Sequence, residues 1–474
     1  MNTKIVIMGG QVQGLIAACL MAKQGANVQI VSFDYEDNDY TEFAKGYKAG
    51  PVTHVPFAIP QDLIDDLDLK THGPDTLATT VKNPFSTLPF YDGLCELLKA
   101  FRSLDDNRPS YKEKAWRDAW GTFELGRILA GYDANIQSLF AQSTTLSLID
   151  LLDAVDIDEP SKTKIITQCI MGSRTDPEAR GSAASILPAM AAFEQDGIVI
   201  QGSLHPLLRA LKQIAMTHGV QFLEGQTITE IAQNNGEITS ITTDGGEKIE
   251  ADYFVLDSDP VLFFERFGNG FSMPPAFQNR VTQSQNLKDC VHIQLALSAL
   301  PDGLKTHRLI APSVDYITSA RNDFKRDGGS QLPICSSINI TKNNENFAAD
   351  GHYVLDVLSH YFDPQLIDNK GARDAQIMTT IQALDKAYPN MSDAIIHSSI
   401  RPMNTQAGQA NFTGSMALLQ LFKIFFGHHA MGYDIPFNNV LVAGYGNDAC
   451  AHYHVYNGGV RVANLLHSLS NNAK

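Results

Sequence analysis

The sequence predicts an α/β protein in which a discontinuous Rossmann-like domain carries an inserted mixed α+β domain. Three observations lead to this prediction. The chain begins with a strand, a glycine turn, a helix and a second strand, and both strands are short apolar runs. A meander of strands follows near residue 230, and the chain ends with a strand and a helix. Long helical patterns separate these segments, so the second domain is expected to fill the gaps.

The N-terminal unit reads IVIMGGQVQGLIAACLMAKQGANVQIVS from residue 5. We expect a strand at Lys4–Met8, a helix at Leu15–Lys23 and a second strand at Val28–Val31. Gly25 stands where a glycine ends many helices, because it adopts the left-handed conformation without strain. The order strand, turn, helix, strand is the βαβ unit that binds dinucleotides in Rossmann-like folds.

The glycine turn departs from the G-x-G-x-x-G fingerprint at one position. Gly9 and Gly14 hold the first and third positions, but Gln11 stands at the second, beside the extra Gly10. Ser32 stands where an acidic residue usually binds the ribose, and a hydroxyl is a weaker acceptor than a carboxylate. The helix N-terminus can still bind a diphosphate, because its free N–H groups and its dipole remain. A βαβ unit without a dinucleotide is the alternative interpretation.

The remaining patterns divide the chain. Residues 76–194 are mostly helical in pattern, and residues 204–218 form a helix that ends at Gly219. Residues 227–260 indicate a β-meander with turns at Asn235-Gly236 and Gly245-Gly246. The nucleotide-binding domain is therefore expected to comprise residues 1–75, 195–265 and 431–474, and the inserted substrate domain residues 76–194 and 266–430.

Composition excludes some classes of function. The net charge of −16 argues against a nucleic-acid-binding protein and against electrostatic docking on anionic lipid. The six cysteines include no CxxC pair, which favours reduced thiols in a cytoplasmic protein. We find no convincing signal peptide and no apolar run long enough for a membrane-spanning helix. Membrane contact stays open but is not favoured, and a homo-oligomer or a protein partner is also left open.

Three separated segments resemble one family. They are the N-terminal fingerprint with YKAGPVTHVPFAIPQDLIDDLDLKTHG, the stretch from GIVIQGSLHPLLRAL to YFVLDSDP, and NNVLVAGYGNDACAHYHVYNGGVRVANLL. Their order and spacing are similar to the phytoene dehydrogenase-like flavoproteins, the carotenoid desaturase-related branch of the FAD-dependent amine-oxidase superfamily. The resemblance covers nearly the whole chain. It implies an FAD/NAD(P)-binding fold with FAD as the cofactor.

Carried over by position, the resemblance assigns residues to parts of FAD. The glycine turn would lie at the pyrophosphate, Ser32 at the ribose and the backbone of Ile228 at the adenine. Asp448 would face the ribityl chain, and Gly458-Gly459 would begin a helix aimed at the flavin ring. The expected cofactor-binding residues are Gly9, Gly10, Gln11, Gln13, Gly14, Ser32, Ile228, Asp448, Gly458, Gly459 and Val460.

The chain also departs from the family pattern outside the glycine turn. SFDYEDNDYTEFAKG replaces the family's acidic and then arginine-rich run, and ACAHYHVY replaces a His-Pro-Gly stretch near the closing segment. These departures fall on cofactor contacts and on the catalytic face. They suggest altered cofactor binding, altered chemistry or both.

The closing segment supplies most of the predicted catalytic residues, namely His452, Tyr453, His454 and Tyr456. In an extended segment the two histidines point the same way and suit acid/base work beside the flavin. Packed or surface histidines are the simpler interpretation, and no metal site is predicted. Lys45 is a further candidate near flavin or substrate, although a solvated loop lysine is the commoner case.

The resemblance therefore predicts an FAD-dependent oxidoreductase that abstracts hydride from a largely apolar small organic substrate. Two alternatives stay open. One is a flavin-poor, non-redox homologue that acts as a partner subunit or accessory factor in a biosynthetic pathway, favoured by Gln11 and Ser32. The other is a flavin-dependent isomerase.

Overall fold

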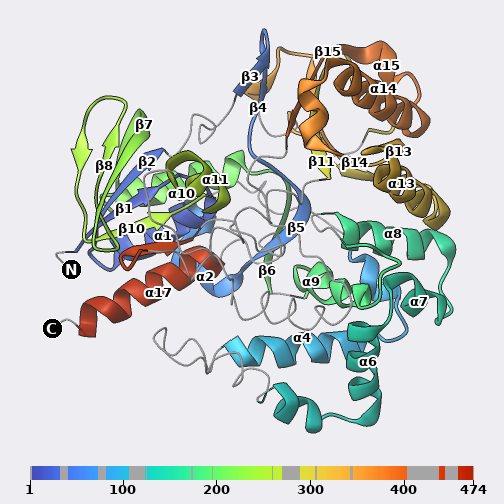
Figure 1. Ribbon diagram of the computed structural model, residues 1–474, viewed down its shortest axis with the longest axis horizontal. Helices are drawn as coiled ribbons and strands as arrows, with labels where there is room; N and C mark the ends of the chain where they lie inside the picture. Colours follow the sequence, from blue (N-terminus) through green and yellow to red (C-terminus); the bar gives the residue numbers. More distant parts are fainter. Residues whose placement is uncertain are drawn as a thin grey trace.

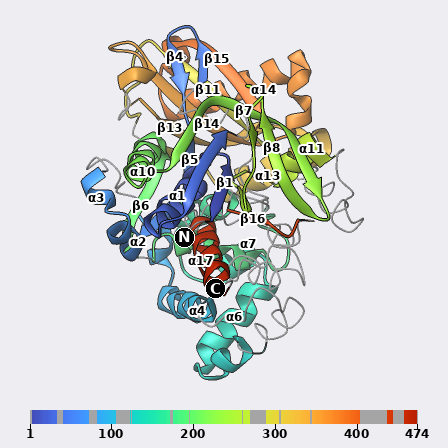
Figure 2. The same ribbon diagram turned by 90° about the vertical axis from the view of Figure 1, so that its left-hand side faces the viewer.

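The fold is an α/β arrangement of two large sheets and two two-stranded sheets with a separate layer of helices (Figure 1). The computed structural model describes residues 3–32, 41–72, 82–105, 123, 125–171, 175–194, 196–258, 260–268, 289–304, 307–341, 345–402, 437–443 and 457–472. Among these residues the N-terminal strand and the C-terminal helix lie in the same part of the molecule (Figures 1 and 2). This arrangement confirms the predicted mixed α/β class.

The first sheet has seven strands in the order β16-β10-β1-β2-β7-β8-β9. Its strands are β1 (Lys4–Met8), β2 (Asn27–Ser32), β7 (Gln221–Asn234), β8 (Glu237–Thr243), β9 (Lys248–Ile249), β10 (Tyr253–Leu256) and β16 (Val440–Val442). The strands from β16 to β7 are parallel. The long strand β7 then leaves the parallel part and pairs antiparallel with β8, which forms the predicted meander.

Helices cover both faces of this sheet. Helices α1 (Val12–Lys23), α10 (His205–Thr217) and α17 (Asn457–Asn472) share one core with alternate residues of β1 and β2. On the other face, α11 (Pro260–Phe267) supplies phenylalanines that pack with Val6, Met8 and the meander. Residues on both faces of β1 are buried, as expected for a parallel strand between helical layers.

The second sheet is antiparallel and has five strands in the order β12-β13-β14-β11-β15. Its strands are β11 (Cys290–Leu297), β12 (His307–Ile310), β13 (Gly329–Asn339), β14 (Tyr353–Phe362) and β15 (Ile395–Pro402). One face packs its aliphatic side chains, Val291, Ile293, Leu355 and Val357 among them, in a core shared with α14 (Lys370–Ala387) and α15 (Met391–Ala394). In Figure 1 this sheet lies with α13 (Val314–Asp327), α14 and α15 on one side of the molecule.

Two antiparallel strands join the sheets. They are β5 (Val52–Pro60) and β6 (Gly197–Ser203), and β5 crosses the middle of the molecule (Figure 1). Val52 packs with the five-stranded sheet, whereas Phe57 and Ile59 pack with α1 and α10. Eight of the nine residues of β5 are buried. The strand therefore runs from one core into the other.

A layer of helices packs beneath these strands in Figure 1. It consists of α4 (Tyr91–Asp105), α6 (Ala134–Thr145), α7 (Leu148–Asp153), α8 (Glu159–Ile170) and α9 (Ile186–Ala191). Side chains of Asp133, Ser147 and Asp158 cap three of them. The helical pattern predicted for residues 76–194 is confirmed for the described part of that range.

The predicted elements mostly hold, with shifted ends. The first helix begins at Val12 rather than Leu15. The C-terminal helix begins at Asn457 and therefore includes the glycine pair Gly458-Gly459. Both meander turns are present, with Asn235, Gly236 and Gly246 at positive φ. No helix in the described part of the chain is both long and apolar enough to cross a bilayer. The five cysteines described are free thiols.

Candidate functional site

The turn between β1 and α1 is built by close packing against the end of β10. Gly9 has φ +120°, and a Cβ there would lie 2.5 Å from the carbonyl oxygen of Asp257. A Cβ at Gly14 would lie 2.3 Å from the Oδ2 atom of Asp257. Both positions therefore exclude side chains, as the first and third fingerprint glycines do. Gly10 is different, because a Cβ there would contact only Ile30, at 3.8 Å.

The N-terminus of α17 lies against the N-terminus of α1. A Cβ at Gly458 would lie 1.7 Å from the side-chain oxygen of Gln13 and 2.2 Å from the carbonyl oxygen of Ala443. A Cβ at Gly459 would lie 2.3 Å from the backbone oxygen of Gln13. The glycine pair lets two helices begin side by side, and Val460 continues the packing. Two positive helix ends therefore meet beside the turn.

Two further predicted cofactor residues, Ser32 and Ile228, lie at the same edge of the sheet. Ser32 ends β2 and pairs with Thr227, the residue before Ile228 in β7. The carbonyl oxygen of Ile228 accepts a hydrogen bond from Arg266 at 3.0 Å. In parallel sheets the carboxyl ends of the strands form the nucleotide-binding edge. The structure thus brings the glycine turn, Ser32, Ile228 and the start of α17 to one edge of the sheet, and their contacts with FAD stay a prediction.

These residues fit a dinucleotide with one exception, the charge of Asp257. The Gln11 side chain does not cap α1, and the first turn of the helix has no acidic residue. N–H groups of that turn can therefore bind phosphate oxygens. However, the buried carboxylate of Asp257 accepts the backbone N–H of Gln11 at 2.7 Å. When ionised, this carboxylate places a negative charge against the helix end that would bind the diphosphate.

Of the predicted catalytic residues, the structure describes only Lys45. Lys45 lies in the turn between β3 (Thr41–Ala44) and β4 (Tyr47–Ala49), and its side chain is exposed. His452, Tyr453, His454, Tyr456 and Asp448 lie outside the described residues. Their roles stay predictions.

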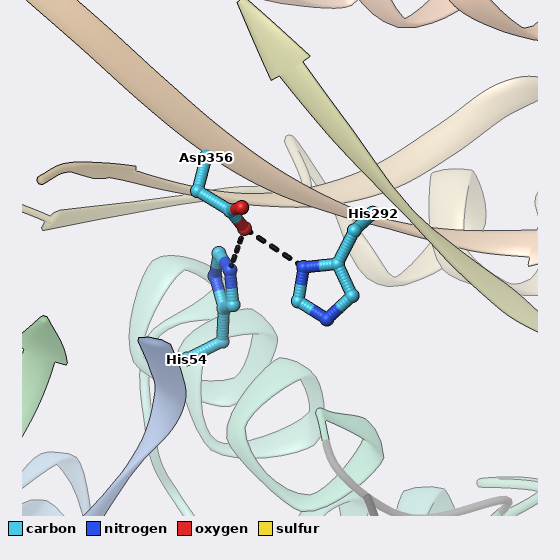
Figure 3. A group of neighbouring side chains, drawn as sticks. All are labelled: His54, His292 and Asp356. Carbon is cyan, nitrogen blue, oxygen red and sulfur yellow. Dashed lines mark hydrogen bonds and ion pairs between the residues drawn. The ribbon is translucent and has the colours of Figure 1, made fainter. Parts of the chain in front are cut away.

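A second polar site, which the sequence did not predict, lies where β5 meets the five-stranded sheet (Figure 3). Asp356 of β14 accepts hydrogen bonds from His54 Nε2 and from His292 Nδ1, both at 2.8 Å and both on the same oxygen, Oδ1. The three side chains come from β5, β14 and β11 and are buried. We call them the His54–His292–Asp356 cluster.

Further polar residues extend the cluster. The Nδ1 atom of His54 lies 2.9 Å from the Ser336 hydroxyl, which is 3.0 Å from the Nε2 atom of His307. Gln201 of β6 donates a hydrogen bond to the backbone oxygen of His54 at 2.8 Å. With His54 neutral, its Nε2–H donates to Asp356 and its Nδ1 accepts the Ser336 proton. The line of contacts leads from Asp356 to the partly exposed His307.

Burial and nearby charges set the protonation states of Asp356, His54 and His307. Burial lowers the pKa of His54, although the hydrogen bond and the charge of Asp356 oppose the shift. Burial would raise the pKa of Asp356, but the charges and hydrogen bonds of His292 and His54 together hold the pKa well below its usual range. Burial lowers the pKa of His307 to about 3. Asp356 is therefore ionised, while His54 and His307 are neutral at pH 7.

The sequence carries a weak signal for this cluster. His54, His292 and Asp356 each interrupt an apolar run, in VTHVPF, VHIQLAL and YVLDVL. A polar residue inside a strand that is buried on both faces needs a partner, because an unpaired buried polar group is costly. The pattern could have flagged the three residues. It could not have paired them, because more than 60 residues separate each from the next.

Comparisons with known proteins support the fold. No protein-family model matches the chain. The chain is 21% identical over 353 residues to the rat protein "Pyridine nucleotide-disulfide oxidoreductase domain-containing protein 2", and the match covers 63% of this chain and 60% of that one. It is 23% identical to 4,4'-diaponeurosporene oxygenase of Staphylococcus haemolyticus, over 75% of this chain and 74% of the relative. The chain thus spans less than two thirds of the rat protein.

Solved structures show the same arrangement. An oxidoreductase from Methanosarcina mazei superposes with a TM-score of 0.54 at 14% identity, covering 98% of this chain and all of the other. Putrescine oxidase bound to putrescine superposes with a TM-score of 0.50 at 12% identity, covering 98% and 99%. These likenesses concern the fold. The resemblance predicted from the motifs is therefore confirmed: this chain is similar in sequence to 4,4'-diaponeurosporene oxygenase and shares its fold with an oxidoreductase and with putrescine oxidase.

Proposed function

We propose that the chain is an FAD-dependent oxidoreductase of the dehydrogenase or desaturase type. The convergence of the α1 and α17 N-termini on the glycine turn is the observation that carries this proposal. Two helix ends give more positive potential to a diphosphate than one helix end does. Glycines at both ends let the diphosphate approach the backbone.

The chain's own residues would hold the cofactor at several points. Gly9 and Gly10 line the turn at the diphosphate, and the Ser32 hydroxyl lies at the end of β2 for the ribose. The backbone of Ile228 lies beside it for the adenine. When bound, the flavin supplies the electron sink for a hydride. The protein supplies orientation and electrostatics.

The substrate class is part of the proposal. We infer a largely apolar small organic molecule that loses a hydride. One relative takes its name from 4,4'-diaponeurosporene, on which it acts as an oxygenase. His452, His454, Tyr453 and Tyr456 remain the proposed acid/base residues, and Lys45 a proposed residue near the substrate.

A non-redox homologue is the second candidate, and Asp257 favours it. The Asp257 carboxylate already accepts the Gln11 N–H at the helix end where a diphosphate would bind. Two negative groups at one helix end repel each other, which weakens FAD binding. A chain that binds flavin weakly could serve as a partner subunit in a biosynthetic pathway.

The visible absorption spectrum of the purified protein separates the two candidates. We expect a flavin band near one flavin per chain, and we expect the flavin in the supernatant after heat denaturation. A band that stays with the pellet means a covalent flavin link. The absence of a band, also after incubation with added FAD, overturns the oxidoreductase proposal in favour of the partner subunit.

A further inference from the structure

We propose that His54, His292 and Asp356 bind one divalent transition-metal ion. The proposal stands apart from the flavin site, because the cluster lies on the five-stranded sheet and shares no residue with the glycine turn. One ligand atom from each side chain lies within 4.8 Å of the other two. The residue types suit such an ion, since imidazole and carboxylate are ordinary ligands of Zn²⁺ and Fe²⁺.

The hydrogen bonds of the cluster are unevenly distributed. Both imidazoles donate to Oδ1 of Asp356, whereas Oδ2 has no hydrogen-bond partner among the described residues. Asp356 is fully buried, and its lone pairs on Oδ2 face no donor. A buried carboxylate oxygen without a donor is costly. Ligand atoms that converge on one point are what an ion requires, and an ion would compensate the carboxylate charge.

Small movements give the geometry of a metal site. An ion about 2.0–2.1 Å from each ligand needs ligand atoms roughly 3.3 Å apart in a tetrahedral arrangement. The two separations of 2.8 Å would therefore open by about 0.5 Å. Three protein ligands leave a fourth position open, as in catalytic zinc sites. His292 is the most exposed of the three ligands, with 7% of its side chain exposed against 2% for His54 and 0% for Asp356.

Neighbouring groups orient the ligands. Ser336 contacts the Nδ1 atom of His54, so that Nε2 is directed at Asp356. With an ion bound, the proton would lie on Nδ1 and be donated to the Ser336 hydroxyl, which leaves the Nε2 lone pair for the metal. The side-chain amide of Gln201 donates a hydrogen bond to the backbone carbonyl oxygen of His54 and so holds this part of β5 in place. Partners behind the ligands fix the ring orientation and the tautomer in metal sites. Ser336 is accordingly a positioning residue.

A second group of potential metal ligands must be distinguished from the His54–His292–Asp356 cluster. Asp289, Cys290 and His360 also lie close enough together to hold an ion. That group contains a thiol, whereas the His54–His292–Asp356 cluster offers only nitrogen and oxygen. Asp289 also directly follows residues that the structure does not describe. The ligand atoms around a bound ion therefore identify the site.

The first experiment uses the full chain without an affinity tag. The protein is treated with a chelator, dialysed to equilibrium against Zn²⁺ or Co²⁺, and analysed for metal content. Flavin absorbance does not disturb this readout. We expect one ion per chain, and zinc X-ray absorption should show two imidazoles and only nitrogen and oxygen ligands. No bound ion at about 100 μM metal, or a sulfur ligand at the zinc, overturns the proposal.

Variants link the ion to the cluster. His292→Gln should weaken zinc binding at least 100-fold, whereas Ser336→Ala should weaken it about 10-fold. His218→Gln is the matched control, because His218 is exposed at the end of α10. Equal losses in His292→Gln and His218→Gln would mean surface binding. Should His292→Gln fail to fold, the ligand set of the wild-type protein still decides the proposal.

Discussion

The two polar regions of the molecule each contain a buried aspartate, and the two carboxylates have different kinds of partner. Asp257 accepts a backbone N–H at the start of α1, on the seven-stranded sheet. Asp356 accepts two imidazole N–H groups on the five-stranded sheet. The first arrangement depends on backbone shape, which glycines encode. The second depends on side chains from distant strands. The comparison shows that a local motif can be read from a sequence, whereas a convergent cluster needs the fold.

The largest effect is expected from removing the carboxylate of Asp356. Asp356→Ala leaves two buried imidazoles without their acceptor, which should lower the free energy of unfolding by about 3–5 kcal/mol. Urea denaturation at pH 7 measures this change. Asp374→Ala is the control, because that carboxylate is 54% exposed and its ion pair with Arg373 spans 3.6 Å. The control should change stability by less than about 0.5 kcal/mol. Equal effects would mean that the cluster contributes little to stability.

Glycine substitutions test the close packing of the turn between β1 and α1. Gly14→Ala places a Cβ 2.3 Å from the Asp257 carboxylate, so overpacking should cost about 1–3 kcal/mol. Flavin binding should weaken at the same time, since the turn must shift. Gly10→Ala is the matched control for stability alone, because its Cβ meets only Ile30 at 3.8 Å. Urea denaturation compares the stability of the two variants, and flavin titration compares Gly14→Ala with the wild type. A stable Gly14→Ala variant with unchanged flavin binding would contradict the close packing.

The same contrast explains what could be predicted from the sequence. Gly9, Gly14 and the strand β1 lie within a few residues of each other, so one local pattern predicted the turn, the helix and the sheet edge. Gly458 and Gly459 were found through the family resemblance, because nothing local shows that their helix packs on Gln13. The departure at Asp257 was not foreseen, since its contact with Gln11 spans 246 residues. His54 and Asp356, 302 residues apart, meet only through strand pairing.

Neutralising Asp257 should strengthen cofactor binding. Asp257→Asn keeps an oxygen that can accept the Gln11 N–H but removes a charge from the helix end. Less repulsion of the diphosphate should tighten FAD binding by about tenfold, or about 1.4 kcal/mol. Fluorescence titration of flavin-free protein with FAD gives the affinity. An unchanged affinity would mean that no anion binds beside this carboxylate. It would favour the non-redox homologue if FAD also binds weakly to the wild type.

His307, on the five-stranded sheet, should make the free energy of unfolding depend on pH. Burial lowers its pKa in the folded protein to about 3 from 6.5, so between these values the unfolded chain binds a proton that the folded chain does not. Its stabilising contribution is complete above pH 6.5 and decreases as the pH falls. Because His307 is partly exposed, we expect a loss of roughly 1 kcal/mol between pH 7 and pH 5. His307→Gln should flatten this slope in urea denaturation at pH 7, 6 and 5. An equal pH dependence of the free energy of unfolding in the wild type and in His307→Gln would mean that other groups cause it.

The smallest effect is expected at Lys45, which belongs to neither region. Its side chain is exposed in the β3–β4 turn, where a lysine is normally solvated. Lys45→Ala should therefore change the free energy of unfolding by less than about 0.5 kcal/mol and leave the FAD affinity unchanged. Urea denaturation and flavin titration measure both quantities, with Lys386→Ala near the end of α14 as the control. A clear loss of FAD affinity in Lys45→Ala alone would mean that the turn reaches the cofactor. The sequence-based proposal for Lys45 would then be favoured over a solvated loop lysine.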